Sequence, residues 1–103
     1  MNPSKVERSK THKLTDLPNV GQAMARDLEL IGVNAPKGLI DRDPLELYEL
    51  LCERTKVRQD PCVLDAFMSI TDYVGGNQPR PWWAYTDERK RLYGRILDGG
   101  RNR

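Results

Sequence analysis

Apolar residues recur along most of the chain at helical spacing, every third or fourth position. The pattern is clearest in residues 22–31, 44–54 and 61–74, and a short apolar turn at 14–17 precedes them. From Thr86 onward, acidic residues are followed by basic ones, the order that the helix dipole favours. No segment alternates apolar and polar residues as a half-buried strand does. We therefore predict an all-α protein, a small bundle of about five helices.

Capping residues mark where these helices begin and end. Asp43-Pro44 and Asp60-Pro61 each place a carboxylate before a proline, which is typical of a helix N-terminus. Thr86 is expected to cap the last helix, while Gly32 and Gly75-Gly76 are expected to end two earlier ones. The sequence thus defines a helical hairpin between residues 43 and 76.

The same spacing predicts which side chains form the core. In the helix at 44–54 we expect Leu47, Leu50 and Leu51 to be buried, with Tyr48 at the margin. In the helix at 61–74 we expect one apolar stripe of Val63, Ala66, Phe67, Ile70 and Val74. In the last helix, Leu92 pairs with Ile96 and Tyr93 with Leu97.

Length and composition favour one soluble domain. The 103 residues match the common size of a single domain, and the 38% hydrophobic content supports a modest core. No apolar run has the length of a membrane span or of a secretory signal. We expect a flexible basic arm at 1–12, one helical domain at 13–98 and a disordered tail at 99–103. A cytoplasmic location and no membrane partner are the corresponding expectations.

The net charge of +2 is unevenly distributed. Residues 1–13 hold four Lys or Arg against one Glu, residues 14–79 hold six against eleven acidic residues, and residues 80–103 hold seven against three. The centre is therefore acidic and both ends are basic. A nucleic-acid partner would be held partly by the ends of the chain.

The segment 14–33 resembles a helix-hairpin-helix motif. Leu17-Pro18-Asn19-Val20-Gly21 has the form of its tight turn, and a small residue, a leucine and a final Gly-apolar pair follow at helical spacing. Such a turn leaves the first amides of the second helix without hydrogen-bond partners, and the helix dipole adds partial positive charge there. A phosphate oxygen can accept hydrogen bonds from these amides and is attracted by the same charge. The predicted nucleic-acid-binding residues are Lys13, Pro18, Asn19, Val20, Gly21, Gln22, Ala23 and Arg26.

Four blocks of sequence together resemble the small bacterial "pathogenicity locus" helix-hairpin-helix family. They are 17–21, 47–52, 58–65 and 81–86, and they agree with that family in order and spacing. The hairpin alone is also similar to the C-terminal domain of competence regulators of the TfoX type. The resemblance implies a SAM-like all-helical fold and a DNA-related role, and it supplies no reaction or catalytic residue.

Two functions follow from these observations. The first is a non-enzymatic module that binds DNA without sequence specificity, because backbone amides contact phosphates and read no base. The alternative is a protein-interaction module in which the acidic centre contacts a basic partner and the hairpin is only structural. Gln22 and Ala23 favour the alternative, since many DNA-binding hairpins carry Lys or Arg there, and so do Asp16, Asp27 and Glu29 nearby.

The remaining candidate chemistry is sparse. Cys52 and Cys62 form a candidate thiol pair, and a reactive thiolate at Cys62, in the first turn of its helix, is a third hypothesis. The favoured interpretation is that both are small apolar residues of a helical hairpin. The two cysteines and His12 do not provide a zinc site, and we expect no metal, cofactor, small-molecule substrate or enzymatic activity.

Trp82 and Trp83 lie between Arg80 and the basic run 89–91. This arrangement is similar to a base-stacking platform for single strands, which makes both rings candidate stacking residues. We favour instead the docking of at least one ring in the core, because a small core needs its large side chains.

Overall fold

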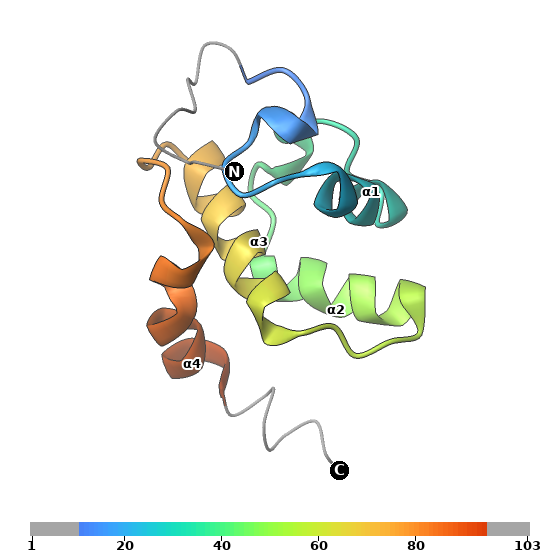
Figure 1. Ribbon diagram of the computed structural model, residues 1–103. Helices are drawn as coiled ribbons and strands as arrows, with labels where there is room; N and C mark the ends of the chain where they lie inside the picture. The colour runs from blue at the N-terminus through green and yellow to red at the C-terminus, as the bar shows by residue number, and fades with distance from the viewer. Residues whose placement is uncertain (1–10, 95–103) are drawn as a thin grey trace.

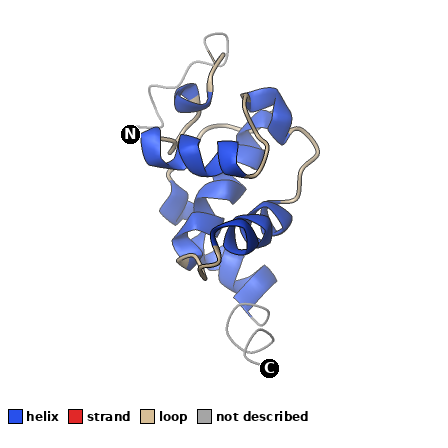
Figure 2. Cartoon of the chain, turned by 90° about the vertical axis from the view of Figure 1, so that its right-hand side faces the viewer, coloured by secondary structure: helices blue, strands red, loops and turns tan. Residues whose placement is uncertain are grey.

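The computed structural model describes residues 11–94, and this part of the chain contains helices and loops without strands (Figures 1 and 2). The prediction of an all-helical fold is confirmed. Residues 11–94 contain four α-helices: α1 (Gln22–Leu30), α2 (Pro44–Thr55), α3 (Pro61–Val74) and α4 (Thr86–Gly94). The same residues also contain the 3-10 turns η3 (Leu14–Asp16), which precedes α1, η4 (Pro36–Leu39), between α1 and α2, and η5 (Trp82–Tyr85), between α3 and α4. The short first helix of the predicted hairpin is therefore the single 3-10 turn η3.

Helix α3 lies at the centre, with α2 on one side and α4 on the other (Figure 1). Every residue from Leu64 to Ile70 is buried, so neighbouring elements surround this helix instead of covering one stripe. The predicted stripe holds for Ala66, Phe67 and Ile70, whereas Val63 and Val74 are only partly buried. α3 is thus the element against which α2, α4 and the turns η4 and η5 are positioned.

The predicted N-termini of the two long helices are confirmed by their capping contacts. An Asp43 carboxylate oxygen accepts the backbone N–H of Leu45 at 3.2 Å, and one from Asp60 accepts that of Cys62 at 2.9 Å. In each helix proline occupies the first position, where no amide partner is needed. The sequence therefore sets both helix starts locally.

The aromatic part of the core differs from the expectation. Tyr48 is fully buried and not marginal, because its hydroxyl donates a hydrogen bond to the carbonyl of Gln59. Neither tryptophan docks in the core, since Trp82 and Trp83 are 37% and 62% exposed. Tyr85 is buried in their place, and its hydroxyl donates to an Asp72 carboxylate oxygen at 2.7 Å.

Helix α4 is attached to α3 through a buried carboxylate. Asp65 accepts hydrogen bonds from the Thr86 hydroxyl and from Nε of Arg89, each at 2.8 Å. Its side chain is 1% exposed, and that of Arg89 is 12% exposed. The expected capping role of Thr86 is wrong, because η5 runs directly into α4 and the hydroxyl is bonded to Asp65.

Several expectations fall outside the described residues. They are most of the basic arm at 1–12, the pairings of Ile96 and Leu97, and the tail at 99–103. Of the arm, Thr11 and His12 are described, and the Thr11 hydroxyl is hydrogen-bonded to the Tyr73 hydroxyl at 3.1 Å.

Candidate nucleic-acid interface

The turn between η3 and α1 is fixed from inside the molecule. Pro18 is buried and Val20 is fully buried, so their side chains attach the turn to the core. Asn19 adopts a left-handed backbone with φ of 66°, a conformation that asparagine tolerates better than most residues. Its amide donates hydrogen bonds to Ser69 Oγ at 3.0 Å and to the Arg80 carbonyl at 2.8 Å. The Asn19 side chain is therefore an internal anchor, with its amide nitrogen bonded within the fold.

Directly after this anchor the chain is open to solvent. Gly21, Gln22 and Ala23 are all exposed and form the N-cap and first two positions of α1. No side chain caps this helix, and Ala25 is the first residue whose amide bonds back, at 3.0 Å to the Gly21 carbonyl. The amides of Gln22 and Ala23 precede that bond. This corner has the exposed backbone that anion binding requires.

Glycine at position 21 is not required by the fold. Its φ of −100° is accessible to any residue, and a Cβ built there meets no atom within 4 Å. Gly32 differs, because it ends α1 with φ of +88°. The Gly32 and Val33 amides bond to the Glu29 and Leu28 carbonyls in the pattern of a Schellman cap, as the sequence predicts for this helix end.

The charges around the exposed amides are mixed. Lys13 and Arg26 are exposed, and Glu29 is exposed on the same helix as Arg26. The Asp16 carboxylate is already hydrogen-bonded to its own segment, because the backbone amides of His12 and Lys13 each donate to one of its oxygens at 3.0 Å. These bonds lower the pKa of the Asp16 carboxyl, and burial raises the pKa of Asp27. Lys13, just before η3, and Arg26, on α1, are thus exposed cations on the elements that flank the turn.

The tryptophan pair lies on the segment that the hairpin anchors. The rings of Trp82 and Trp83 meet edge to face, with centroids 5.7 Å apart and planes 85° apart. The Arg80 guanidinium lies over the Tyr85 ring, 4.7 Å from its centroid. The two indoles are thus held as an ordered, exposed pair two residues beyond the carbonyl that Asn19 binds.

The cysteines do not form a disulfide in the structure. Cys52 is buried and accepts a hydrogen bond from the Gln59 amide at 3.3 Å, while Cys62 is partly buried. Burial and the neighbouring Asp60 carboxylate raise the pKa of the Cys62 thiol. This direction does not favour the helix-activated thiolate considered for Cys62, which stays a hypothesis.

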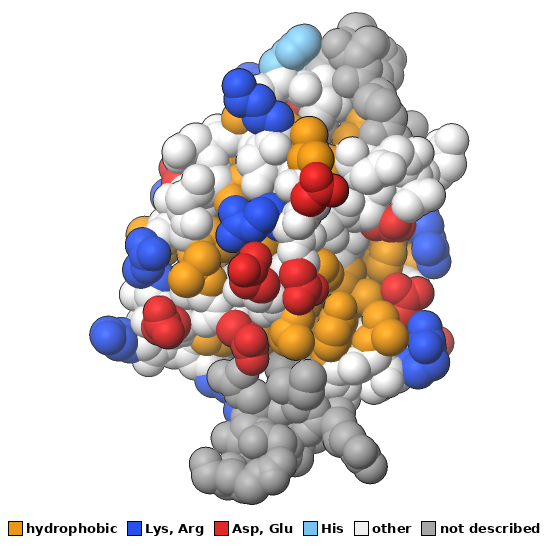
Figure 3. Space-filling model, turned by 180° about the vertical axis from the view of Figure 1, so that it is seen from behind, with side chains coloured by type: hydrophobic (Ala, Val, Ile, Leu, Met, Phe, Trp, Pro, Cys, Tyr) orange, Lys and Arg blue, Asp and Glu red, His pale blue; other side chains and the backbone are white. Residues whose placement is uncertain are grey.

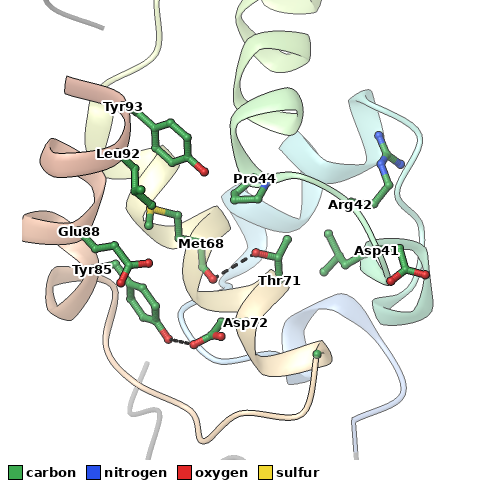
Figure 4. Close-up of a pocket in the computed structure, with 12 residues that line it drawn as sticks. Asp41, Arg42, Pro44, Met68, Thr71, Asp72, Tyr85, Glu88, Leu92 and Tyr93 are labelled. Carbon is green, nitrogen blue, oxygen red and sulfur yellow. Dashed lines mark hydrogen bonds between the residues drawn. The ribbon is translucent and has the colours of Figure 1, made fainter. Parts of the chain in front are cut away.

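A groove of about 350 Å³ lies between η4, the start of α2, α3 and α4 (Figure 4). Asp41, Asp72 and Glu88 lie in its wall with Arg42 as a cation, so the groove carries excess negative charge. Figure 3 likewise shows one face of the molecule on which acidic side chains lie beside exposed hydrophobic ones. The excess of carboxylates in the groove makes it a poor candidate for a phosphate site.

The model of the family described as Pathogenicity locus (Cdd1) matches residues 7–91. The chain belongs to this family. A relative of the same kind, the mitomycin resistance protein McrB of Streptomyces lavendulae, is 52% identical over 79 residues, which cover 77% of this chain and 75% of that protein. No solved structure matches the chain.

The Pathogenicity locus match extends over η3, the turn and α1, and ends within α4. It therefore includes both the exposed amides and the tryptophan pair. Among the described residues, no helix is long and apolar enough to cross a membrane, and no cluster of His, Cys, Asp or Glu is suited to a metal ion.

Sequence reasoning missed the internal role of Asn19. The signal was an asparagine at the second position of a tight turn, which favours a left-handed residue. Its partners, Ser69 and the Arg80 carbonyl, lie 50 and 61 positions away and carry no local signal.

Proposed function

We propose that this protein binds DNA without sequence specificity, through backbone amides at the start of α1. The Gly21, Gln22 and Ala23 amides would contact one phosphate, and Arg26 and Lys13 would contact neighbouring ones. The exposure of residues 21–23 next to an internally fixed turn is the observation that carries the proposal. An anchored turn presents its amides in one geometry, so little ordering is needed when a phosphate binds.

Two features of the surroundings support this assignment. The α1 N-terminus has no side-chain cap, whereas α2 and α3 are capped by aspartates whose carboxylates already occupy the equivalent amides. Position 21 has a residue without a side chain although neither its φ nor its neighbours demand one. A close approach of a phosphate to the backbone explains that choice.

The decisive variant is Gly21→Asp. The backbone of Gly21 is already in the extended conformation of an N-cap, so an aspartate there can accept the α1 amides and keep or slightly improve stability. The same carboxylate occupies the phosphate position and repels DNA. Binding should therefore be lost while the melting temperature is kept, a combination that unfolding cannot produce.

The measurement is anisotropy of a labelled duplex titrated with protein at several salt concentrations. Asn34→Asp is the matched control, because it adds the same charge at an exposed position beyond α1. Arg26→Ala should reduce the slope of log affinity against log salt by about one, whereas Lys37→Ala on η4 should leave the slope unchanged. Absence of duplex binding at low salt, or equal binding by the two aspartate variants, would refute the proposal.

The mitomycin resistance of the Streptomyces relative suggests a cellular assay for the same residues. We propose that this chain also protects cells against mitomycin, because it is 52% identical to that protein over 77% of its own length. A host that expresses the chain should survive higher drug concentrations than one that expresses Gly21→Asp. Equal protection by both would separate resistance from the DNA-binding corner, and would favour a protein partner at the acidic surface.

A further inference from the structure

We infer that Trp82 and Trp83 form a stacking platform for unpaired bases, so that the preferred ligand is DNA with a single-stranded segment next to a duplex. This inference rests on the proposed DNA binding at Gly21 and names the form of DNA which that site would favour. The two indoles would contact base faces, and the α1 amides would contact a phosphate of the same molecule.

The burial of the aromatic residues supports the inference. The core takes up Tyr48, Phe67, Tyr73 and Tyr85 almost completely, whereas the two larger indoles are left 37% and 62% exposed. A tryptophan has the largest apolar surface of any residue, and leaving it in water forgoes the stabilisation of burial. The exposed pair is therefore not explained by packing of the described residues.

The pair is held on a rigid support. The η5 turn is closed by the bond from the Ala84 amide to the Pro81 carbonyl at 3.0 Å. At its end Tyr85 is hydrogen-bonded to Asp72, and the next residue, Thr86, is hydrogen-bonded to Asp65; both carboxylates are on the central helix α3. Because the backbone that carries the two indole rings is fixed by these bonds, base stacking does not have to order it.

The platform and the proposed phosphate site are physically linked. The Asn19 side-chain amide, which fixes the hairpin turn, donates a hydrogen bond to the Arg80 carbonyl. Gly21 lies two residues after Asn19, and Trp82 lies two residues after Arg80. Chain geometry then limits the separation of the Gly21 and Trp82 Cα atoms to roughly 25 Å. A stacked strand covers that distance in about seven nucleotides, so one DNA molecule can reach both sites.

The charges near the platform indicate how it would contribute. Arg80, Lys90 and Arg91 are exposed, but Asp87 and Glu88 follow the rings directly and are exposed as well. Such a mixed surface neutralises few phosphates. The platform would then act through stacking, which is tolerant of sequence and releases few counterions.

The test compares three probes that share one duplex: a blunt duplex, the duplex with a single-stranded tail, and the duplex with an abasic tail of equal length. The abasic tail keeps the phosphates and removes the bases. The wild-type protein should bind the tail with bases about tenfold more tightly than the abasic tail, and this ratio should persist as salt is raised. Trp82 and Trp83 are the two tryptophans of the sequence, so quenching of indole fluorescence by the tail with bases reports on these rings alone.

The variants separate this inference from the proposed function. Trp83→Ala and the double variant Trp82→Ala/Trp83→Ala should reduce the ratio toward one and leave blunt-duplex binding intact. Val57→Ala is the matched control, because it shortens an apolar side chain that is 58% exposed at the α2–α3 connection. Gly21→Asp should weaken all three probes together.

Equal binding of the two tails by the wild-type protein would overturn the platform and leave the duplex proposal standing. A ratio that survives in the double variant would do the same. If Gly21→Asp binds like the wild type while the tail ratio is present, the platform stands and the hairpin proposal fails. Failure of all three probes to bind at low salt would overturn both.

Discussion

The buried ion pair between α3 and α4 gives the sharpest prediction about stability. Asp65→Ala removes a carboxylate that is 1% exposed and accepts two bonds at 2.8 Å, from Thr86 and Arg89. Arg89, which is 12% exposed, is then left as a largely buried cation without its partner. Breaking such a pair costs about 3–5 kcal/mol. For a domain of this size, that loss corresponds to a fall in melting temperature of more than about 10 °C.

The exposed pair of Arg42 and Glu46 is the matched control. Its atoms are 3.3 Å apart, and its side chains are 33% and 60% exposed. Glu46→Ala should therefore cost only about 0.3–0.5 kcal/mol. Thermal melts by circular dichroism and urea titrations measure both variants under the same conditions. If Asp65→Ala costs no more than Glu46→Ala, the attachment of α4 does not depend on the buried carboxylate, and this account of it is refuted.

Three further predictions concern single positions. Gly32→Ala should lower the free energy of unfolding by about 1–2 kcal/mol, because φ of +88° is strained for alanine, and Gly32→Asn should lower it less in the same urea titration. Cys62 should react with iodoacetamide more slowly than a free model thiol at neutral pH, because its pKa is raised, and an equal rate would contradict this. Asp16 has a lowered pKa, so its contribution to stability is present above its ordinary value near 3.8 and is lost as pH falls through the lower folded value. Asp16→Asn should accordingly lose less stability as the pH falls through this range; parallel acid titrations of the two proteins measure this, and equal slopes would contradict it.

The parts of the fold that depend on neighbouring residues in sequence were predictable. Asp43 and Asp60 cap helices that start where the Asp-Pro pairs place them, and Gly32 ends α1 with the expected left-handed backbone. Each of these features needs only a few consecutive residues. Local sequence therefore predicts helix ends well in this protein.

The packing of polar and aromatic side chains was not predictable in the same way. Asp65 stands in an apolar run and gives no local indication that Arg89, 24 positions later, will be its partner. Tyr85 and not a tryptophan enters the core, where Asp72, on another element, accepts a hydrogen bond from its hydroxyl. By contrast, the exposure of residues 21–23, on which the DNA-binding proposal depends, agrees with the open helix start that the turn motif predicts.

The enclosure of α3 has a consequence for how the molecule opens. Because η4, α2, η5 and α4 all pack on this helix, none of them can detach without exposing part of the same apolar surface to water. Amide hydrogens in α3 should then exchange only when the whole domain unfolds, and their protection should report the global stability. A substitution that loosens α2 and one that loosens α4 should therefore lower the same global stability, in a protein that melts in a single step.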